Sequence, residues 1–217
     1  MAKKPLILSR NAAPGRPLPR DFHARPAVEV ARDLIGMHLA LERAGSLRIG
    51  RIVEAEAYQG PDDRAAHSAG GRRTARTEVM FGPAGHAYVY LIYGMWHCLN
   101  VVTAQRDVPH AVLLRALEPI SGIDAVTHGP GLLTRALGID RRDNGLDLCG
   151  TTLWIMEPPR RRPVRIGTGP RIGVDYAGEW AGRPWRFFDA DSVHVSTVSS
   201  ARRRKALNGT GSATGSS

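Results

Sequence analysis

The chain has 217 residues, enough for one domain that buries a core without disulfide support. Its two cysteines, Cys98 and Cys149, form no C-x-x-C pair, which argues against a zinc site or a redox couple. No apolar run is long enough to span a bilayer or to serve as a secretory signal, so we expect a soluble intracellular protein with no membrane partner.

The formal net charge of +10 is concentrated at the two ends of the chain. Residues 1–20 hold five basic and no acidic residues, and residues 199–217 hold four basic and no acidic residues. Basic ends around a nearly neutral body favour a polyanionic partner such as nucleic acid, although solvated ends are the alternative. We expect a flexible basic arm over 1–17, one domain over 18–198 and a disordered tail over 199–217.

Taken in chain order, the first expected element is a helix over 26–36. Val28, Ala31 and Leu34 recur there at helical spacing, and Gly36 is suited to its end. Strands are expected over 38–43, 47–58, 86–93, 96–104, 110–117 and 151–157, with shorter strands over 171–175 and 193–198 and a second helix over 130–138. Short connections predict antiparallel pairing, and hence an α+β fold: a single domain with a curved antiparallel β-sheet flanked by helices.

The strand over 47–58 carries two carboxylates and a tyrosine at alternate positions. Alternation predicts one face with Ile52, Glu54, Glu56 and Tyr58, and an inward face with Val53, Ala55 and Ala57. A solvated strand face is the plainer interpretation of this segment. A turn at 60–63 then opens a long irregular loop, and such loops in compact domains are often functional.

The segment 86–100 predicts an aromatic hairpin. Tyr88 and Tyr90 share one strand face, and the bend at Tyr93-Gly94-Met95 holds an aromatic ring and a methionine out at the tip. Aromatic rings can stack on nucleobases, and apolar side chains at a tip can wedge between base steps. An aromatic core hairpin is the alternative.

Four stretches together closely resemble the alkyladenine (3-methyladenine) DNA glycosylase family. They are RIVEAEAYQGPDDRAAHS (51–68), YVYLIYGM (88–95), VLLRALEP (112–119) and RIGVDYAGEW (171–180). The likeness runs from about residue 18 to residue 196 in the same order. It implies a base-excision-repair enzyme that flips alkylated or deaminated purines out of duplex DNA and hydrolyses their bond to the sugar.

The resemblance also implies residue roles. Glu56 matches the general base that activates water, and Arg115 matches an arginine near that water. Asn100 matches a residue that disfavours normal guanine. The residues that match the walls of the base pocket are Tyr58, His67 and Tyr90. The residues that match DNA-contacting positions are Tyr93 as the wedge, Met95 beside it, and Arg72 and Arg76 toward phosphate.

The only lysines are Lys3, Lys4 and Lys205, all in the expected ends, so we expect no Schiff-base chemistry and no strand cleavage. No metal or other cofactor is expected, since the H-x-E and C-x-x-C signature of zinc deaminases is missing. The expected partner is double-stranded DNA with damaged purines, bound by a monomer in the bacterial cytoplasm, or in the nucleus of a eukaryote. Three alternatives remain: a noncatalytic lesion-recognition protein on the same fold, a helix-hairpin-helix site at residues 129–131, and an RNA-binding module. The sequence also leaves open which purine lesion is the substrate.

Overall fold

The computed structural model describes residues 15–196. Most of the expected arm over 1–17 and all of the expected tail over 199–217 lie outside this range. Residues 15–17 of the arm are described and lie against the sheet, where Pro17 forms a β-bridge with Met156 and the carbonyl of Gly15 accepts a hydrogen bond from the Trp154 indole.

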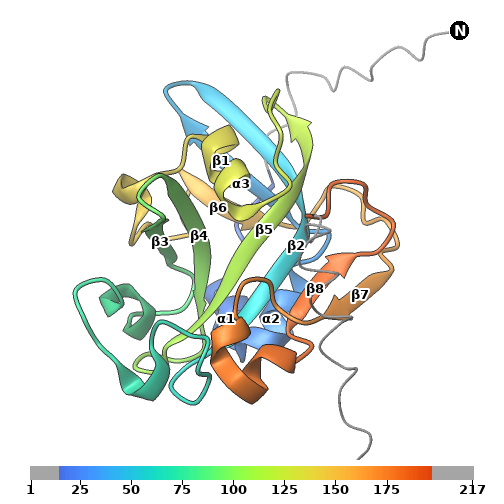
Figure 1. Ribbon diagram of the computed structural model, residues 1–217. Coiled ribbons are helices and arrows are strands. Elements are labelled where there is room, and N and C mark those ends of the chain that lie inside the picture. The colour runs from blue at the N-terminus through green and yellow to red at the C-terminus, as the bar shows by residue number, and fades with distance from the viewer. Residues whose placement is uncertain (1–14, 197–217) are drawn as a thin grey trace, which may run out of the picture.

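The fold is built on one curled antiparallel sheet (Figure 1). Its strands are β1 (His38–Arg43), β2 (Ser46–Gln59), β3 (Ala87–Ile92), β4 (Trp96–Thr103), β5 (His110–Ser121), β6 (Leu153–Met156), β7 (Ile166–Gly169) and β8 (Arg186–Asp189). They run in the order β3-β4-β5-β2-β1-β6, while β8 pairs with β2 and β7. All of these pairings are antiparallel, which confirms the predicted α+β class.

Short helices cover the sheet. They are α1 (Arg20–His23), α2 (Ala27–Asp33) and α3 (Pro130–Leu137), with the 3₁₀ helices η1 (Ala69–Gly71), η2 (Glu78–Phe81), η3 (Arg141–Asp143) and η4 (Asp175–Gly182). The apolar face of α2 packs against β2 and β5, as its spacing predicts, although the helix ends at Asp33 before the expected Gly36. Helix α3 agrees with its predicted range, with a proline in its first turn and Gly138 at φ 74° after its end.

Two irregularities in the β2–β5 pair change the predicted strand faces. Ile52 lies opposite Leu117 and Glu54 opposite Ala116, so Val53 is an extra residue on β2. Because this bulge interrupts the alternation, Ile52 packs in the main core beside Ala55, and its predicted place on the face of Glu54 is wrong. The pairing then skips Arg115 on β5.

The two short strands predicted near the C-terminus are also wrong. Residues 171–174 form a turn and Asp175 begins η4, because the backbone N–H of Ile172 donates to a side chain and Gly173 has φ 82°. Residues 193–196, the described part of the expected strand over 193–198, lie in turns and bends. The strands that do form nearby, β7 and β8, have four residues each and give too little pattern to predict.

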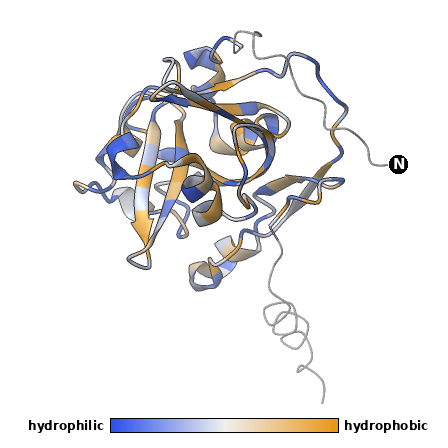
Figure 2. Ribbon diagram, turned by 90° about the horizontal axis from the view of Figure 1, so that it is seen from above, coloured by the Kyte–Doolittle hydropathy of each residue, from blue (hydrophilic) through white to orange (hydrophobic). Residues whose placement is uncertain are grey.

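Hydrophobic residues are concentrated along the strands and helices in the middle of the molecule, and hydrophilic residues gather in the outer loops (Figure 2). Within residues 15–196, no helix is long and apolar enough to cross a membrane.

Candidate active site

The centre of the candidate site is the carboxylate of Glu56, which is completely buried on β2. The Tyr58 hydroxyl donates to its Oε2 at 2.9 Å, and the backbone N–H of Ile172 donates to its Oε1 at 2.7 Å. Arg115 Nη1 lies 3.3 Å from Oε2. Burial raises the pKa of Glu56, while Arg115 and the two hydrogen bonds oppose that rise. A carboxylate whose pKa lies above its ordinary value is a better proton acceptor.

Arg115 reaches Glu56 from the neighbouring strand β5, where it is the residue that the β2–β5 pairing skips. Burial alone would lower the pKa of its guanidinium, but the carboxylates of Glu56 and Glu54 raise it above the ordinary value. Arg115 therefore stays charged beside the carboxylate of Glu56.

A cluster of aromatic rings stands next to this charged group. The rings of His67 and Tyr90 meet nearly edge to face, with centroids 4.6 Å apart, and Tyr88 and Tyr90 have centroids 5.2 Å apart. His67 Nδ1 is 2.9 Å from the Tyr88 hydroxyl. Burial, with help from the charge of Arg76, lowers the pKa of His67 to about 4, so its ring is neutral at pH 7. His67 therefore adds no positive charge to this cluster.

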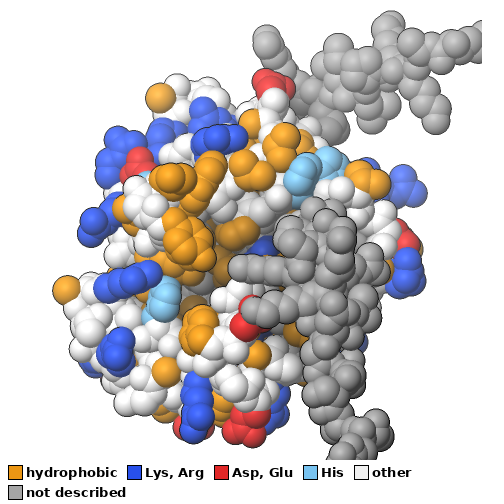
Figure 3. Space-filling model, viewed as in Figure 1, with side chains coloured by type: hydrophobic (Ala, Val, Ile, Leu, Met, Phe, Trp, Pro, Cys, Tyr) orange, Lys and Arg blue, Asp and Glu red, His pale blue; other side chains and the backbone are white. Residues whose placement is uncertain are grey.

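These groups surround a cavity of about 320 Å³, at the small end of the range for small-molecule sites. Six sequence-predicted residues line it: Tyr58, His67, Tyr90, Tyr93, Asn100 and Arg115. Asn100 is held in place by a 3.0 Å hydrogen bond from its Nδ2 to the carbonyl of Tyr88. Glu56 is not in the lining but contacts it through Tyr58 and Arg115. Figure 3 shows hydrophobic side chains gathered around a hollow near the middle of this face, with basic side chains along one edge.

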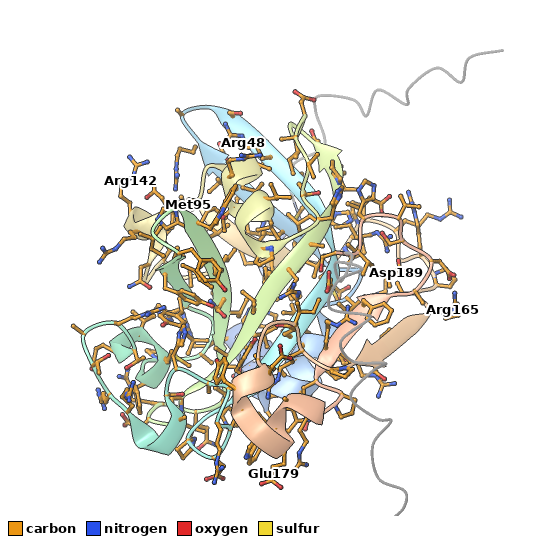
Figure 4. All side chains as sticks on the ribbon, viewed as in Figure 1. Arg48, Met95, Arg142, Arg165, Glu179 and Asp189 are labelled. Atoms are coloured by element: carbon orange, nitrogen blue, oxygen red, sulfur yellow. The ribbon has the colours of Figure 1, made fainter. Side chains whose placement is uncertain are left out.

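The hairpin tip beside the cavity exposes two large apolar side chains. Tyr93 is 81% exposed and Met95 is 69% exposed. Tyr93 has φ 52° and Gly94 has φ 70°, which makes the bend between β3 and β4 tight. Figure 4 shows Met95 at the end of this hairpin, away from the helices η4 and α2. The sequence predicts an aromatic ring and a methionine exposed at a hairpin tip, and the exposure of Tyr93 and Met95 confirms that placement.

The structure separates the two predicted phosphate-contacting arginines. Arg76 is exposed, and its guanidinium lies 4.9 Å from the ring centroid of Tyr90 at the wall of the cavity. Arg72 is exposed on the same loop but does not line the cavity. Among the described residues, neither arginine forms an ion pair, whereas their neighbour Arg73 pairs with Glu78 and Asp107.

Several site residues were not predicted as such. The most informative are Asp63 and Arg171, which form a completely buried ion pair with Arg171 Nη2 2.9 Å from Asp63 Oδ1. The Arg171 guanidinium also lies 4.7 Å from the ring centroid of Tyr58 and so supports that wall. The turn over 171–174 was likewise missed, whereas Tyr88 was named in the aromatic hairpin but was given no role in the pocket. Asp63 and Arg171 lie within the first and fourth matching stretches, which was the available signal.

Within residues 15–196, no group of histidine, cysteine or acidic side chains is arranged to hold a metal ion.

Comparisons with known proteins agree with this geometry. The family model described as methylpurine-DNA glycosylase matches residues 21–193. A protein of Myxococcus xanthus is 52% identical over 190 residues, covering 87% of this chain and 97% of the relative. One of Anaeromyxobacter dehalogenans is 54% identical over 82% of this chain and 86% of its own, and one of Bacillus cereus is 49% identical over 78% and 94%. All three carry the name "Putative 3-methyladenine DNA glycosylase".

The family match covers residues 21–193 of the described 15–196, including the strands that carry Glu56 and Arg115 and the turn that donates to Glu56. At this extent and identity, the chain belongs to the methylpurine-DNA glycosylase family of DNA-repair enzymes.

Proposed function

We propose that this DNA N-glycosylase flips a methylated purine out of duplex DNA and hydrolyses its bond to the sugar with a water molecule that Glu56 activates. The water oxygen bonds to C1′, the C–N bond breaks with its electron pair leaving on the purine, and Glu56 accepts the proton of the water. The products are the free base and an abasic site in an intact strand. Base flipping is needed because the bond is inaccessible inside the duplex.

The observation that carries the proposal is the environment of Glu56. Its carboxylate is buried beside the cavity, two hydrogen bonds and Arg115 fix its position, and its pKa is raised. A fixed carboxylate with a raised pKa can accept a proton and can stabilise the positive charge that develops on the sugar. Arg115, on the cavity side of Glu56, orients the water.

The aromatic cluster supports the assignment of the base pocket. Tyr58, His67 and Tyr90 hold the flipped base by stacking and hydrogen bonding. Burial and the neighbouring Glu56 raise the pKa of Tyr58 well above its ordinary value, so its hydroxyl keeps its proton and continues to donate to Glu56. Asn100, fixed by the Tyr88 carbonyl, disfavours the exocyclic amine of guanine.

The exposed hairpin tip and the nearby arginines support binding to DNA. We propose that this DNA is double-stranded and that a monomer binds it through a catalytic domain over 18–198. Tyr93, with Met95 beside it, fills the gap left by the extruded base. Arg76 beside Tyr90, and Arg72 farther along the loop, contact phosphates. We further propose that the enzyme acts on the nucleoid DNA of a bacterium, which the bacterial origin of the three relatives supports.

Two features support hydrolysis without strand cleavage. Residues 15–196 contain no lysine, so this part of the chain offers no ε-amine for a Schiff base with the sugar. A purine methylated on N3 or N7 carries positive charge and leaves without an acid, which fits a site where the buried carboxylates of Glu54, Glu56 and Asp63 already accept hydrogen bonds.

The test is a single-turnover assay on methylated DNA and on a duplex that contains one hypoxanthine. We expect the wild type to release base from the methylated DNA, and Glu56→Gln to lose rate by about 10²- to 10⁴-fold while it still binds damaged duplex. Release from methylated DNA but not from the hypoxanthine duplex would restrict the pocket to cationic bases. Strands should break only after alkali treatment. Base release by Glu56→Gln at the wild-type rate, or strand breaks before alkali treatment, would contradict the mechanism. Binding of the wild type to the lesion without any base release would indicate a recognition protein.

A further inference from the structure

A second carboxylate, Glu54, is completely buried on the same side of β2 as Glu56 but does not line the cavity. Its Oε1 accepts hydrogen bonds from Arg115 Nε at 3.1 Å and from Arg186 Nη1 at 3.2 Å. Its Oε2 accepts the backbone N–H of Ser196 at 2.7 Å. One carboxylate thus joins β2, β5, β8 and the segment that follows β8.

The contact with Nε fixes how Arg115 faces Glu56. A guanidinium is planar and its donors form a rigid fork, so holding Nε sets the direction of Nη1. Nη1 is the atom that lies 3.3 Å from Glu56 Oε2. Nη2 completes the arrangement by donating to Ser196 Oγ at 3.4 Å. Arg115 is therefore held at three nitrogens by three different residues.

Glu54 reaches the other side of Glu56 through Arg186. Arg186 lies opposite Glu56 in the β2–β8 pair, and its Nε donates to the carbonyl of Pro170 at 2.9 Å. Two residues later, the backbone N–H of Ile172 donates to Glu56 Oε1. Both groups that contact Glu56 from outside β2 are thus tied back to Glu54.

We propose that Glu54 is a positioning residue for base excision, which holds Arg115 and, through Arg186, the turn at 170–172 so that Glu56 keeps its catalytic orientation. The proposal rests on the proposed role of Glu56 as general base. Glu54 itself touches neither the water nor the base.

Removal of the Glu54 charge has a predictable electrostatic effect on Glu56. The ionisable groups around Glu56 are Arg115 on β5, Glu54 and Tyr58 on β2, Arg186 on β8 and Cys98 on β4. Glu54 repels the charged form of Glu56 and competes with it for Arg115. Without that carboxylate, the charged form of Glu56 is more stable, so the acid limb of the rate profile moves to lower pH.

The experiment measures single-turnover base release against pH on methylated DNA, with an enzyme-free blank. Cationic bases leave without protonation, so the acid limb reports the general base. For Glu54→Gln we expect a plateau lower by about 100-fold or less and an acid limb at lower pH. Glu54→Asp keeps the charge but shortens the reach, so its acid limb stays near that of the wild type with an intermediate plateau.

Glu118→Gln is the matched control. Glu118 pairs with Arg51 across the same strands β5 and β2, outside the cavity, and should affect stability without moving the acid limb. An unmoved acid limb in Glu54→Gln, with a rate loss no larger than that of Glu118→Gln, would overturn the positioning role. If Glu54→Gln does not fold, a wild-type plateau in Glu54→Asp overturns it, and a lowered plateau supports it.

Glu56→Gln in the same assay separates the two proposals. If Glu56→Gln is inactive while Glu54→Gln behaves like Glu118→Gln, the proposed function stands and only the role of Glu54 fails. If Glu56→Gln keeps the wild-type rate, the proposed function fails as well.

Discussion

His23 differs from the buried ionisable side chains of the candidate active site. Glu54, Glu56 and Arg115 have hydrogen-bonding or charged partners, whereas neither ring nitrogen of the fully buried His23 has a partner among the described residues. Burial, together with the charges of Arg20 and Arg25, lowers its pKa to about 4. The ring is therefore neutral at pH 7, and protonating it in place is costly.

The first prediction concerns acid stability. In the unfolded chain His23 titrates near 6.5 and in the folded protein near 4, so the unfolded state binds more protons between these values. Stability is therefore lost as the pH falls from about 6.5 to about 4, by a total of about 3 kcal/mol from this residue. We expect His23→Leu to lose less stability over that window, as measured by urea unfolding at each pH.

The exposed His128 provides the control, and His128→Gln should follow the wild-type pH dependence. Parallel curves for His23→Leu and the wild type would show that His23 is not the source of acid sensitivity.

At the scale of elements, the β3–β4 hairpin combines an unfavourable backbone with an exposed aromatic ring. Tyr93 is not a glycine yet has φ 52°, a conformation that costs a non-glycine residue about 1–2 kcal/mol. Its ring is mostly exposed, so burial returns little of that energy. A residue that is costly to the free protein and exposed beside a cavity fits a role that appears only when DNA is bound.

The second prediction therefore separates stability from activity at the hairpin tip. Tyr93→Gly should leave the free energy of unfolding within about 1 kcal/mol of the wild type, because relief of strain offsets the added chain entropy. Base release should fall on the order of 10- to 100-fold, since base–aromatic stacking is lost. Ala44 has φ 50° in the β1–β2 turn, so Ala44→Gly is a matched control that should keep full activity. Equal activity of the two variants would rule out the wedge.

Elements with a strong local pattern could be predicted from the sequence, and those that depend on distant contacts could not. The long strand β2 and the hairpin β3–β4 follow from alternation and a glycine bend. The bulge at Val53 could not be predicted, because alternation alone gives no sign of an extra residue. The apolar and β-branched residues over 171–174 predict a strand, which does not form. The backbone N–H of Ile172 bonds to Glu56 instead, and Arg171 pairs with Asp63, 108 residues earlier.

The site shows the same division. Spacing predicts only that Glu56 and Tyr58 share a strand face, and their expected roles come from the family resemblance. Most of the residues matched by that resemblance line one cavity. The supporting contacts of Glu54 with Arg186 and Ser196 join residues more than 130 positions apart, and no local pattern indicates them.

At the scale of the whole molecule, the positive charge is divided unevenly. Residues 15–196 carry 23 arginines and 20 acidic residues, while residues 1–14 and 197–217 carry seven basic residues and no acidic ones. The described domain alone therefore has little net attraction for DNA, and the third prediction concerns the ends.

A chain limited to residues 15–196 should bind undamaged duplex with a weaker salt dependence. The slope of log K against the logarithm of the salt concentration is negative, and each phosphate contact contributes about 0.9 to its magnitude. Loss of seven charges therefore reduces the magnitude of the slope by about 6 at most. Base release under saturating single-turnover conditions should not change, because the site lies within 15–196. The measurement is fluorescence anisotropy across a salt series, and an unchanged slope would assign the affinity to the domain.

Strand β2 pairs with β1 next to it in the chain, with β5 about 60 residues later and with β8 about 130 residues later. Such distant pairings form slowly, because the intervening loops must close before the contacts stabilise them. During synthesis, Glu56 leaves the ribosome well before Ile172, Arg186 and Ser196 exist. An incomplete chain therefore carries the proposed general base without the groups that contact it, and under this proposal we expect activity only when the last strand has joined the sheet.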